Sequence, residues 1–163
     1  MSETTEPKKA TFIVFAGSLD KIMAAFILAT TAAAMGMETT MFFTFWGLSA
    51  LKKGGPADCK RNWMQSMLGW MLPKKRTDLP LSQLNMGGMG AGMLKKIMAQ
   101  KKIASLPELI EMAVDLDVKM IACQMSMDAM GICREELIDE VEIAGAASYV
   151  GEAKDAAINL FIS

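Results

Sequence analysis

The sequence predicts a single α/β domain built on an open, mostly parallel sheet of about five strands, with helices on both faces. Three observations lead to this prediction. Short apolar runs alternate with helical patterns, the links between them are short, and 52% of the 163 residues are hydrophobic against 21% charged. Alternation of strand and helix favours a parallel sheet, and a chain of this length can bury one full core.

The N-terminal part of the chain predicts one strand–helix–strand unit. Residues 10–15 form a short apolar run typical of a buried strand, and residues 19–34 predict a helix whose start Asp20 helps to cap. Residues 38–45, rich in Thr and Phe, predict the second strand. The nearly continuous apolar stretch 22–46 imitates a membrane span, but its helix is shorter than the roughly 20 residues that span a bilayer. We therefore expect a buried helix followed by a buried strand.

A basic segment, residues 52–102, interrupts this alternation. It holds eleven Lys and Arg against two acidic residues, whereas the rest of the chain holds six against sixteen. Such a segment can bind an anionic protein, an anionic small molecule or a membrane surface. The alternative is that its lysines lie on exposed helices and contact only solvent. Within it, residues 59–72 carry an apolar stripe that predicts a helix, residues 73–80 predict a linker, and residues 93–100 predict a further helix.

The alternating pattern returns in the C-terminal part of the chain. Residues 108–115 predict a helix, residues 118–122 a third strand, and the next helix is expected to start with Ser126 as its N-cap. The remaining elements are a short helix, a strand, a helix and a closing strand, at residues 135–138, 141–143, 146–154 and 157–162. Residues 1–9 are polar and predict a flexible tail, which leaves 10–163 as the domain.

The composition excludes several kinds of chemistry. The chain has no histidine, which removes Ser-His-Asp and Cys-His catalysis and histidine-bearing zinc sites. Its 17 methionines would suit Cu(I), but methionine spread along helices more often fills cores or faces partners, so we expect no metal and no other cofactor. Three cysteines are too few for a secreted disulfide framework, and the N-terminus has no secretion-signal pattern. We expect reduced thiols and a cytoplasmic protein.

Two further motifs favour structural roles. Residues 85–93 hold four glycines, but they lack the Gly-Lys-Ser/Thr ending of a phosphate-binding loop and do not follow a strand. We expect them to form a flexible lid. The aromatic run at residues 42–46 lies on a predicted strand, where it is expected to build core rather than stack on bases. No nucleic-acid partner is therefore expected.

Cys123 lies where the strand predicted over residues 118–122 ends and a helix begins. This position can make a cysteine reactive. Helix-start amides and the helix dipole favour thiolate over thiol. Ligands of parallel sheets gather at the carboxyl ends of strands, where the prediction brings Gly17–Ser18, Trp46–Gly47 and Cys123 together. Position alone leaves open the alternative of an inert core cysteine. A direct bond from Cys123 to Cys133 would require local unfolding if the residues between them are helical.

Five stretches, in order along nearly the whole chain, resemble the DsrE/DsrF-like family of small sulfur-carrier proteins, which includes TusD-type sulfurtransferases. They are residues 17–21, 42–47, 85–90, 123–128 and 141–145. The chain is most similar to the branch often labelled peroxiredoxin-like. The resemblance implies a flavodoxin-like sheet, homotrimers or larger homo-oligomers, and a single cysteine that carries sulfur as a persulfide. That cysteine maps onto Cys123.

On this resemblance, Cys123 takes sulfane sulfur from a donor and passes it to an acceptor, with proteins or small thiols as partners. The resemblance leaves open whether the carrier also acts as a sulfurtransferase enzyme. Gln124 and the helix-start amides support the anion, Ser126 donates a hydrogen bond to it, and Asp128 opposes it if it faces the sulfur. Cys59 and Cys133 match no family position and are treated as incidental.

Two other classes of function stay open. One is an oligomeric binding or scaffold protein that docks a partner or a membrane surface through its basic, apolar segment. The other is a thiol oxidoreductase that works through a sulfenate or an intermolecular disulfide.

Overall fold

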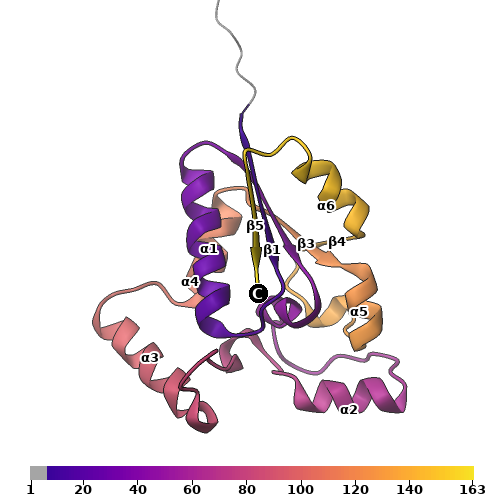
Figure 1. Cartoon of the computed structure of the whole chain (residues 1–163). Coiled ribbons are helices and arrows are strands. Elements are labelled where there is room, and N and C mark those ends of the chain that lie inside the picture. The colour runs from indigo at the N-terminus through magenta and orange to yellow at the C-terminus, as the bar shows by residue number, and fades with distance from the viewer. Residues whose placement is uncertain (1–6) are drawn as a thin grey trace, which may run out of the picture.

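The computed structural model describes residues 7–163, and within them five parallel strands form one sheet in the order β4-β3-β2-β1-β5 (Figure 1). The strands are β1 (Lys9–Val14), β2 (Glu38–Phe43), β3 (Lys119–Cys123), β4 (Glu142–Ala144) and β5 (Ile158–Ile162). The predicted fold class is therefore confirmed. Most of the predicted N-terminal tail lies outside the described residues, and β1 begins at Lys9.

Helices cover both faces of the sheet and extend beyond the carboxyl ends of its strands (Figure 1). They are α1 (Leu19–Ala34), α2 (Trp63–Met71), α3 (Met89–Gln100), α4 (Leu106–Asp115), α5 (Gln124–Met130) and α6 (Ala146–Ala153). α1 and α4 pack together on one face, and α6 lies on the other. α2 and α3, which belong to the basic segment, lie beyond the carboxyl edge.

The two faces of the sheet bury two clusters of side chains, because successive strand residues point to opposite sides. The larger cluster lies against α1 and α4 and includes Phe12, Met41 and Met120, which occupy matching positions on neighbouring strands. The smaller cluster lies beneath α6 and contains Phe42, Ile121, Cys123 and Tyr149. Cys123 is therefore part of the smaller core.

The stretch that imitates a membrane span is α1 followed by β2, as expected. Phe26 of α1 packs on Phe43 of β2 with ring centroids 5.8 Å apart, and both side chains are fully buried. Among residues 7–163, none of the helices combines the length and the apolar character needed to cross a bilayer.

The helix predicted over residues 59–72 is shorter and more exposed than its apolar stripe suggests. α2 starts after Asn62, whose side chain accepts a hydrogen bond from the Gln65 amide, while the Gln65 side chain bonds back to the Asn62 amide. Every residue of α2 is exposed or half-buried, and Trp70 is 79% exposed. Leu68 packs against the main core, whereas the other large apolar side chains of α2 face solvent: Trp63, Met64, Met67, Trp70 and Met71.

The glycine-rich stretch is helical where a flexible lid was expected. A 3-10 turn, η3 (Met86–Gly88), leads directly into α3, so these residues form the start of a helix rather than an irregular loop. Gly87 has φ 69°, which glycine adopts without strain. A Cβ atom on Gly90 would lie 1.9 Å from the carbonyl oxygen of Leu84. The glycines thus serve a tight turn and a close backbone approach.

Asp20 ties the start of α1 to the chain before η3. Its Oδ1 accepts a hydrogen bond of 2.9 Å from the Ser82 amide, and its Oδ2 accepts one from the Ser82 hydroxyl. Partial burial alone would raise the pKa of Asp20, but the hydrogen bonds prevail and hold this pKa below its usual value of 3.8. Asp20 therefore contributes stability that is present above pH 3.8 and lost as the pH falls through the lowered pKa.

We expect Asp20→Asn to lower the melting temperature at neutral pH, because the charge-assisted hydrogen bonds are weakened. The difference from the wild-type protein should shrink as the pH falls below 3.8, where the wild-type carboxyl takes up its proton. Thermal unfolding of both proteins from neutral to acidic pH checks this. A difference that stays constant across this range would contradict the assigned role of Asp20.

Candidate functional site

Cys123 is the last residue of β3 and the N-cap residue of α5. It pairs with Ala144 of β4, and its side chain packs with Phe42, Ile121 and Tyr149. The residue is 3% exposed, and within residues 7–163 it forms no disulfide. The structure thus places a free but buried thiol at the carboxyl end of an inner strand.

Ser126 is not the N-cap of α5, because the helix begins directly after Cys123. Ser126 lies inside the first turn and is buried, with its Oγ 2.7 Å from Oγ1 of Thr44. Thr44 follows β2, so this hydrogen bond fastens α5 to the end of the neighbouring strand. The Ser126 hydroxyl is thus engaged with Thr44, a residue that the sequence analysis did not single out.

Gln124 and Asp128 lie on the exposed face of α5. Nε2 of Gln124 donates a hydrogen bond of 2.9 Å to Oδ1 of Asp128. The backbone carbonyl of Asp128 accepts a further hydrogen bond of 2.8 Å from Nε2 of Gln65 in α2. Asp128 therefore joins α5 to α2 through Gln65, while Gln124 bonds to Asp128 within α5.

The chain segments that follow β1 and β2 approach each other closely. A Cβ atom on Gly17 would lie 2.8 Å from Cβ of Trp46, and one on Gly47 would lie 2.0 Å from the carbonyl oxygen of Val14. Ser18 occupies the N-cap position of α1. The contacts of these residues join them to one another, whereas Cys123 packs on the α6 side of the sheet. Gly17, Ser18, Trp46 and Gly47 therefore form part of the carboxyl edge of the sheet.

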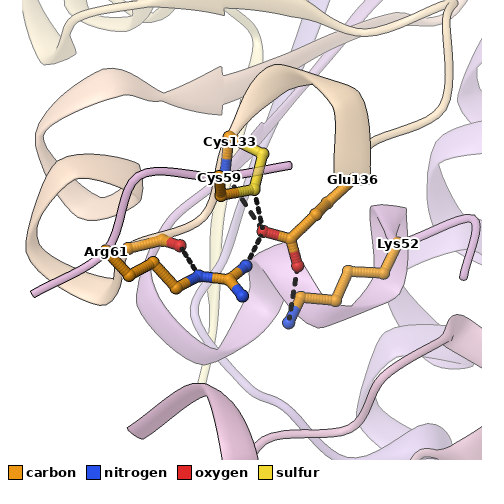
Figure 2. A network of polar contacts seen from close by, with 6 residues as sticks. Lys52, Cys59, Arg61, Cys133 and Glu136 are labelled. Atoms are coloured by element: carbon orange, nitrogen blue, oxygen red, sulfur yellow. Dashed lines mark hydrogen bonds and ion pairs between the residues drawn. A yellow bond between two sulfur atoms is a disulfide. The ribbon is translucent and has the colours of Figure 1, made fainter. Parts of the chain in front are cut away.

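Cys59 and Cys133 form a disulfide (Figure 2), with Cα atoms 5.9 Å apart across a sequence separation of 74 residues. The bond links the chain before α2 to the loop after α5. The expectations that these cysteines are incidental and that the thiols are all reduced are therefore wrong for this structure. Cys133 bonds to Cys59 rather than to Cys123, in line with the expected geometry.

The carboxylate of Glu136 lies beside this disulfide and is paired with two cations, Lys52 and Arg61 (Figure 2). Glu136, at the end of the 3-10 turn η4 (Arg134–Glu136), pairs through Oε1 with Arg61 and through Oε2 with Nζ of Lys52 at 3.7 Å. The same Oε1 accepts a hydrogen bond of 3.2 Å from the Cys133 amide and lies 3.4 Å from Sγ of Cys59. Both cysteines are half-buried, and a cavity of about 530 Å³ borders them.

Lys52 is 3% exposed, and this burial has the largest effect on its pKa. Burial lowers the pKa of Lys52 below its usual value; the Glu136 carboxylate opposes this effect and the Arg61 cation reinforces it. The carboxylate beside the disulfide thus has one buried and one half-buried cationic partner.

The ligand-type atoms of Cys59, Cys133 and Glu136 lie within 4.8 Å of one another. The two sulfur atoms are bonded to each other, so neither is a thiolate available to a metal ion. The cluster is therefore a disulfide with a neighbouring carboxylate.

These features define a flavodoxin-like α/β protein with a thiol at the carboxyl edge of its sheet. Residues 6–161 match the DsrE/DsrF/DrsH-like family, and the chain belongs to this family. The resemblance stated from the sequence is confirmed.

Two relatives match along almost their whole length. The chain is 42% identical over 159 residues to protein YrkE of Bacillus subtilis, covering 98% of this chain and 99% of YrkE. It is 40% identical over 169 residues to the sulfur carrier protein DsrE2 of Allochromatium vinosum, covering 96% and 99%. The crystal structure of the ychN protein from E. coli has a similar fold, with a TM-score of 0.57 at 14% identity over 95% of this chain and 99% of that one.

Proposed function

We propose that this protein is a sulfur carrier that holds sulfane sulfur as a persulfide on Cys123 and passes it to a partner thiol. The similarity to the sulfur carrier DsrE2 over almost the full length of both chains supports this proposal. The free thiol at the carboxyl end of β3 is the observation that carries it, because ligands of parallel sheets gather at that edge.

The proposed chemistry needs only thiols. The Cys123 thiolate attacks the outer sulfur of a donor persulfide, and the donor thiolate leaves. An acceptor thiolate then attacks the terminal sulfur on Cys123, which regenerates the Cys123 thiolate. Because Cys123 is 3% exposed and is buried in one cluster with Phe42 and Tyr149, the side chains around it have to move for each transfer.

The proposed partners are sulfur donor and acceptor proteins or small thiols, and the proposed assembly is a homo-oligomer in the cytoplasm. The basic segment 52–102 offers a surface for such partners, since α2 exposes Trp63 and Trp70 and lysines precede and follow this helix in the sequence. The same exposed side chains favour a second candidate function, docking of a partner or a membrane surface. Such docking would persist in Cys123→Ser and weaken strongly with salt.

Intact mass spectrometry tests the carrier proposal. The protein with its Cys59–Cys133 disulfide intact is incubated with glutathione persulfide, so that Cys123 is the thiol that remains to react. We expect a gain of about 32 Da, one sulfur atom, in the wild-type protein and none in Cys123→Ser. The double variant Cys59→Ser/Cys133→Ser is the matched control and should still gain one sulfur. Undiminished loading of Cys123→Ser would refute the proposal.

A further inference from the structure

The sulfur carriage proposed for Cys123 leaves the Cys59–Cys133 pair unused. Both cysteines are half-buried, whereas Cys123 is buried. Disulfides in cytosolic proteins are usually transient, and either catalytic or redox-sensing. A pair that borders a cavity and lies beside a carboxylate held by two cations therefore suggests chemistry of its own.

We propose that Cys59 and Cys133 form a second reactive site that reduces sulfane sulfur to sulfide, and that the disulfide is the state reached after sulfide has left. In the first step the Cys133 thiolate attacks the outer sulfur of an organic persulfide, R–S–SH. A bond forms between Cys133 and that sulfur, the bond within the persulfide breaks, and the thiolate R–S⁻ leaves.

In the second step Cys59 resolves this intermediate. The Cys59 thiol gives its proton to the Glu136 carboxylate, and its sulfur attacks Sγ of Cys133. The Cys59–Cys133 bond forms, and the terminal sulfur leaves as HS⁻. The two cysteine sulfurs together lose two electrons and the sulfane sulfur gains two. A dithiol reductant then returns the pair to its reduced form, supplying two electrons and two protons.

The contacts around the pair assign these roles. The side chain of Cys133 stands in a capping arrangement at the start of η4, facing the backbone amide of Glu136, and an amide so placed favours an attacking thiolate over a thiol. Sγ of Cys59 instead lies 3.4 Å from a carboxylate oxygen of Glu136, within reach of proton transfer in the reduced state. Lys52 and Arg61 hold that carboxylate in place (Figure 2).

The cavity beside the pair indicates the class of substrate. It measures about 530 Å³, and its lining includes both cysteines together with Lys60 and Arg134. Two cationic residues against one acidic residue favour an anionic donor, and an organic persulfide with carboxylate groups, such as glutathione persulfide, fits this requirement. Asp128 also lines the cavity, next to the polar side chain of Gln124.

A single-turnover experiment tests this activity separately from carriage by Cys123. All proteins carry Cys123→Ser, are reduced, freed of reductant and given one equivalent of glutathione persulfide. Sulfide is measured against a protein-free blank, and the protein is weighed by intact mass spectrometry. In this background we expect about one equivalent of sulfide per chain and a loss of about 2 Da, as the disulfide forms.

Adding Cys59→Ser should stop sulfide release and trap an adduct of about 32 Da on Cys133, whereas adding Cys133→Ser should prevent both sulfide release and disulfide formation. Glu136→Gln should slow only the second step, so that the same adduct accumulates before sulfide appears, a pattern that a purely structural role would not produce. Equal sulfide release with and without Cys59, or a pair that stays reduced throughout, would overturn the proposal. Neither result depends on whether Cys123 is a carrier.

Discussion

Reduction of the Cys59–Cys133 disulfide is expected to lower the free energy of unfolding by about 4 kcal/mol. The bond closes a long loop, since its cysteines are 74 residues apart in the sequence. Cross-linking such distant residues removes conformational freedom from the unfolded chain, and the loss grows with loop length. The sheet itself has an apolar core that does not include the disulfide, so we expect the reduced protein to stay folded.

Denaturant unfolding with and without a dithiol reductant measures this effect. The double variant Cys59→Ser/Cys133→Ser is the control: it should match the reduced wild-type protein and show no response to reductant. A reduced wild-type protein as stable as the oxidised one would show that the bond is absent in solution or that the unfolded chain gains nothing from its loss.

Gly47→Ala is expected to destabilise the protein by about 3 kcal/mol through overpacking. A Cβ atom at this position would lie 2.0 Å from the carbonyl oxygen of Val14 and 2.8 Å from its carbonyl carbon. Val14 belongs to β1 and is fully buried, so its backbone cannot move aside without disturbing the sheet. Relief of the clash has to come from a shift of the whole chain segment after β2.

Gly92→Ala is the matched control for that substitution. Gly92 lies in α3 with nothing within 4 Å of the position of an added Cβ, and alanine favours the helix over glycine by about 0.5–1 kcal/mol. Chemical denaturation followed by circular dichroism should therefore give changes of opposite sign for the two variants. If Gly47→Ala is as stable as the wild type, the close approach of the two strand ends is not present in solution.

Most of the sheet was predictable because its strands are apolar runs bounded by polar or glycine-containing links. The strand expected at residues 118–122 is β3, shifted by one residue, and the helix expected at 19–34 is α1. The exposure of α2 was not predictable, because the spacing of Trp63 and Trp70 indicates a common helix face but not whether anything covers it. Whether another element covers that helix face depends on the tertiary structure.

The candidate site was predictable only in part, for a similar reason. The position of Cys123 at a strand end follows from local pattern. The helix after it starts without a linker, because Cys123 keeps an extended backbone (φ −69°, ψ 113°) while serving as the N-cap, and this displaces Ser126 from the role expected of it. The contact of Cys59 with Cys133 depends on the path of the whole basic segment, which no local periodicity reveals.

The place of β5 in the sheet has a consequence for how the protein folds. β5 pairs with β1, so that Thr11 contacts Asn159 across 148 residues of sequence, whereas β1 and β2 are joined by the single helix α1. Parallel pairing over such a distance closes slowly. During synthesis β1 and β2 can associate early, and β1 then keeps one unpaired edge until β5 arrives. Unpaired edges of this kind recruit strands from other chains, so docking of β5 is the step at which aggregation competes with folding.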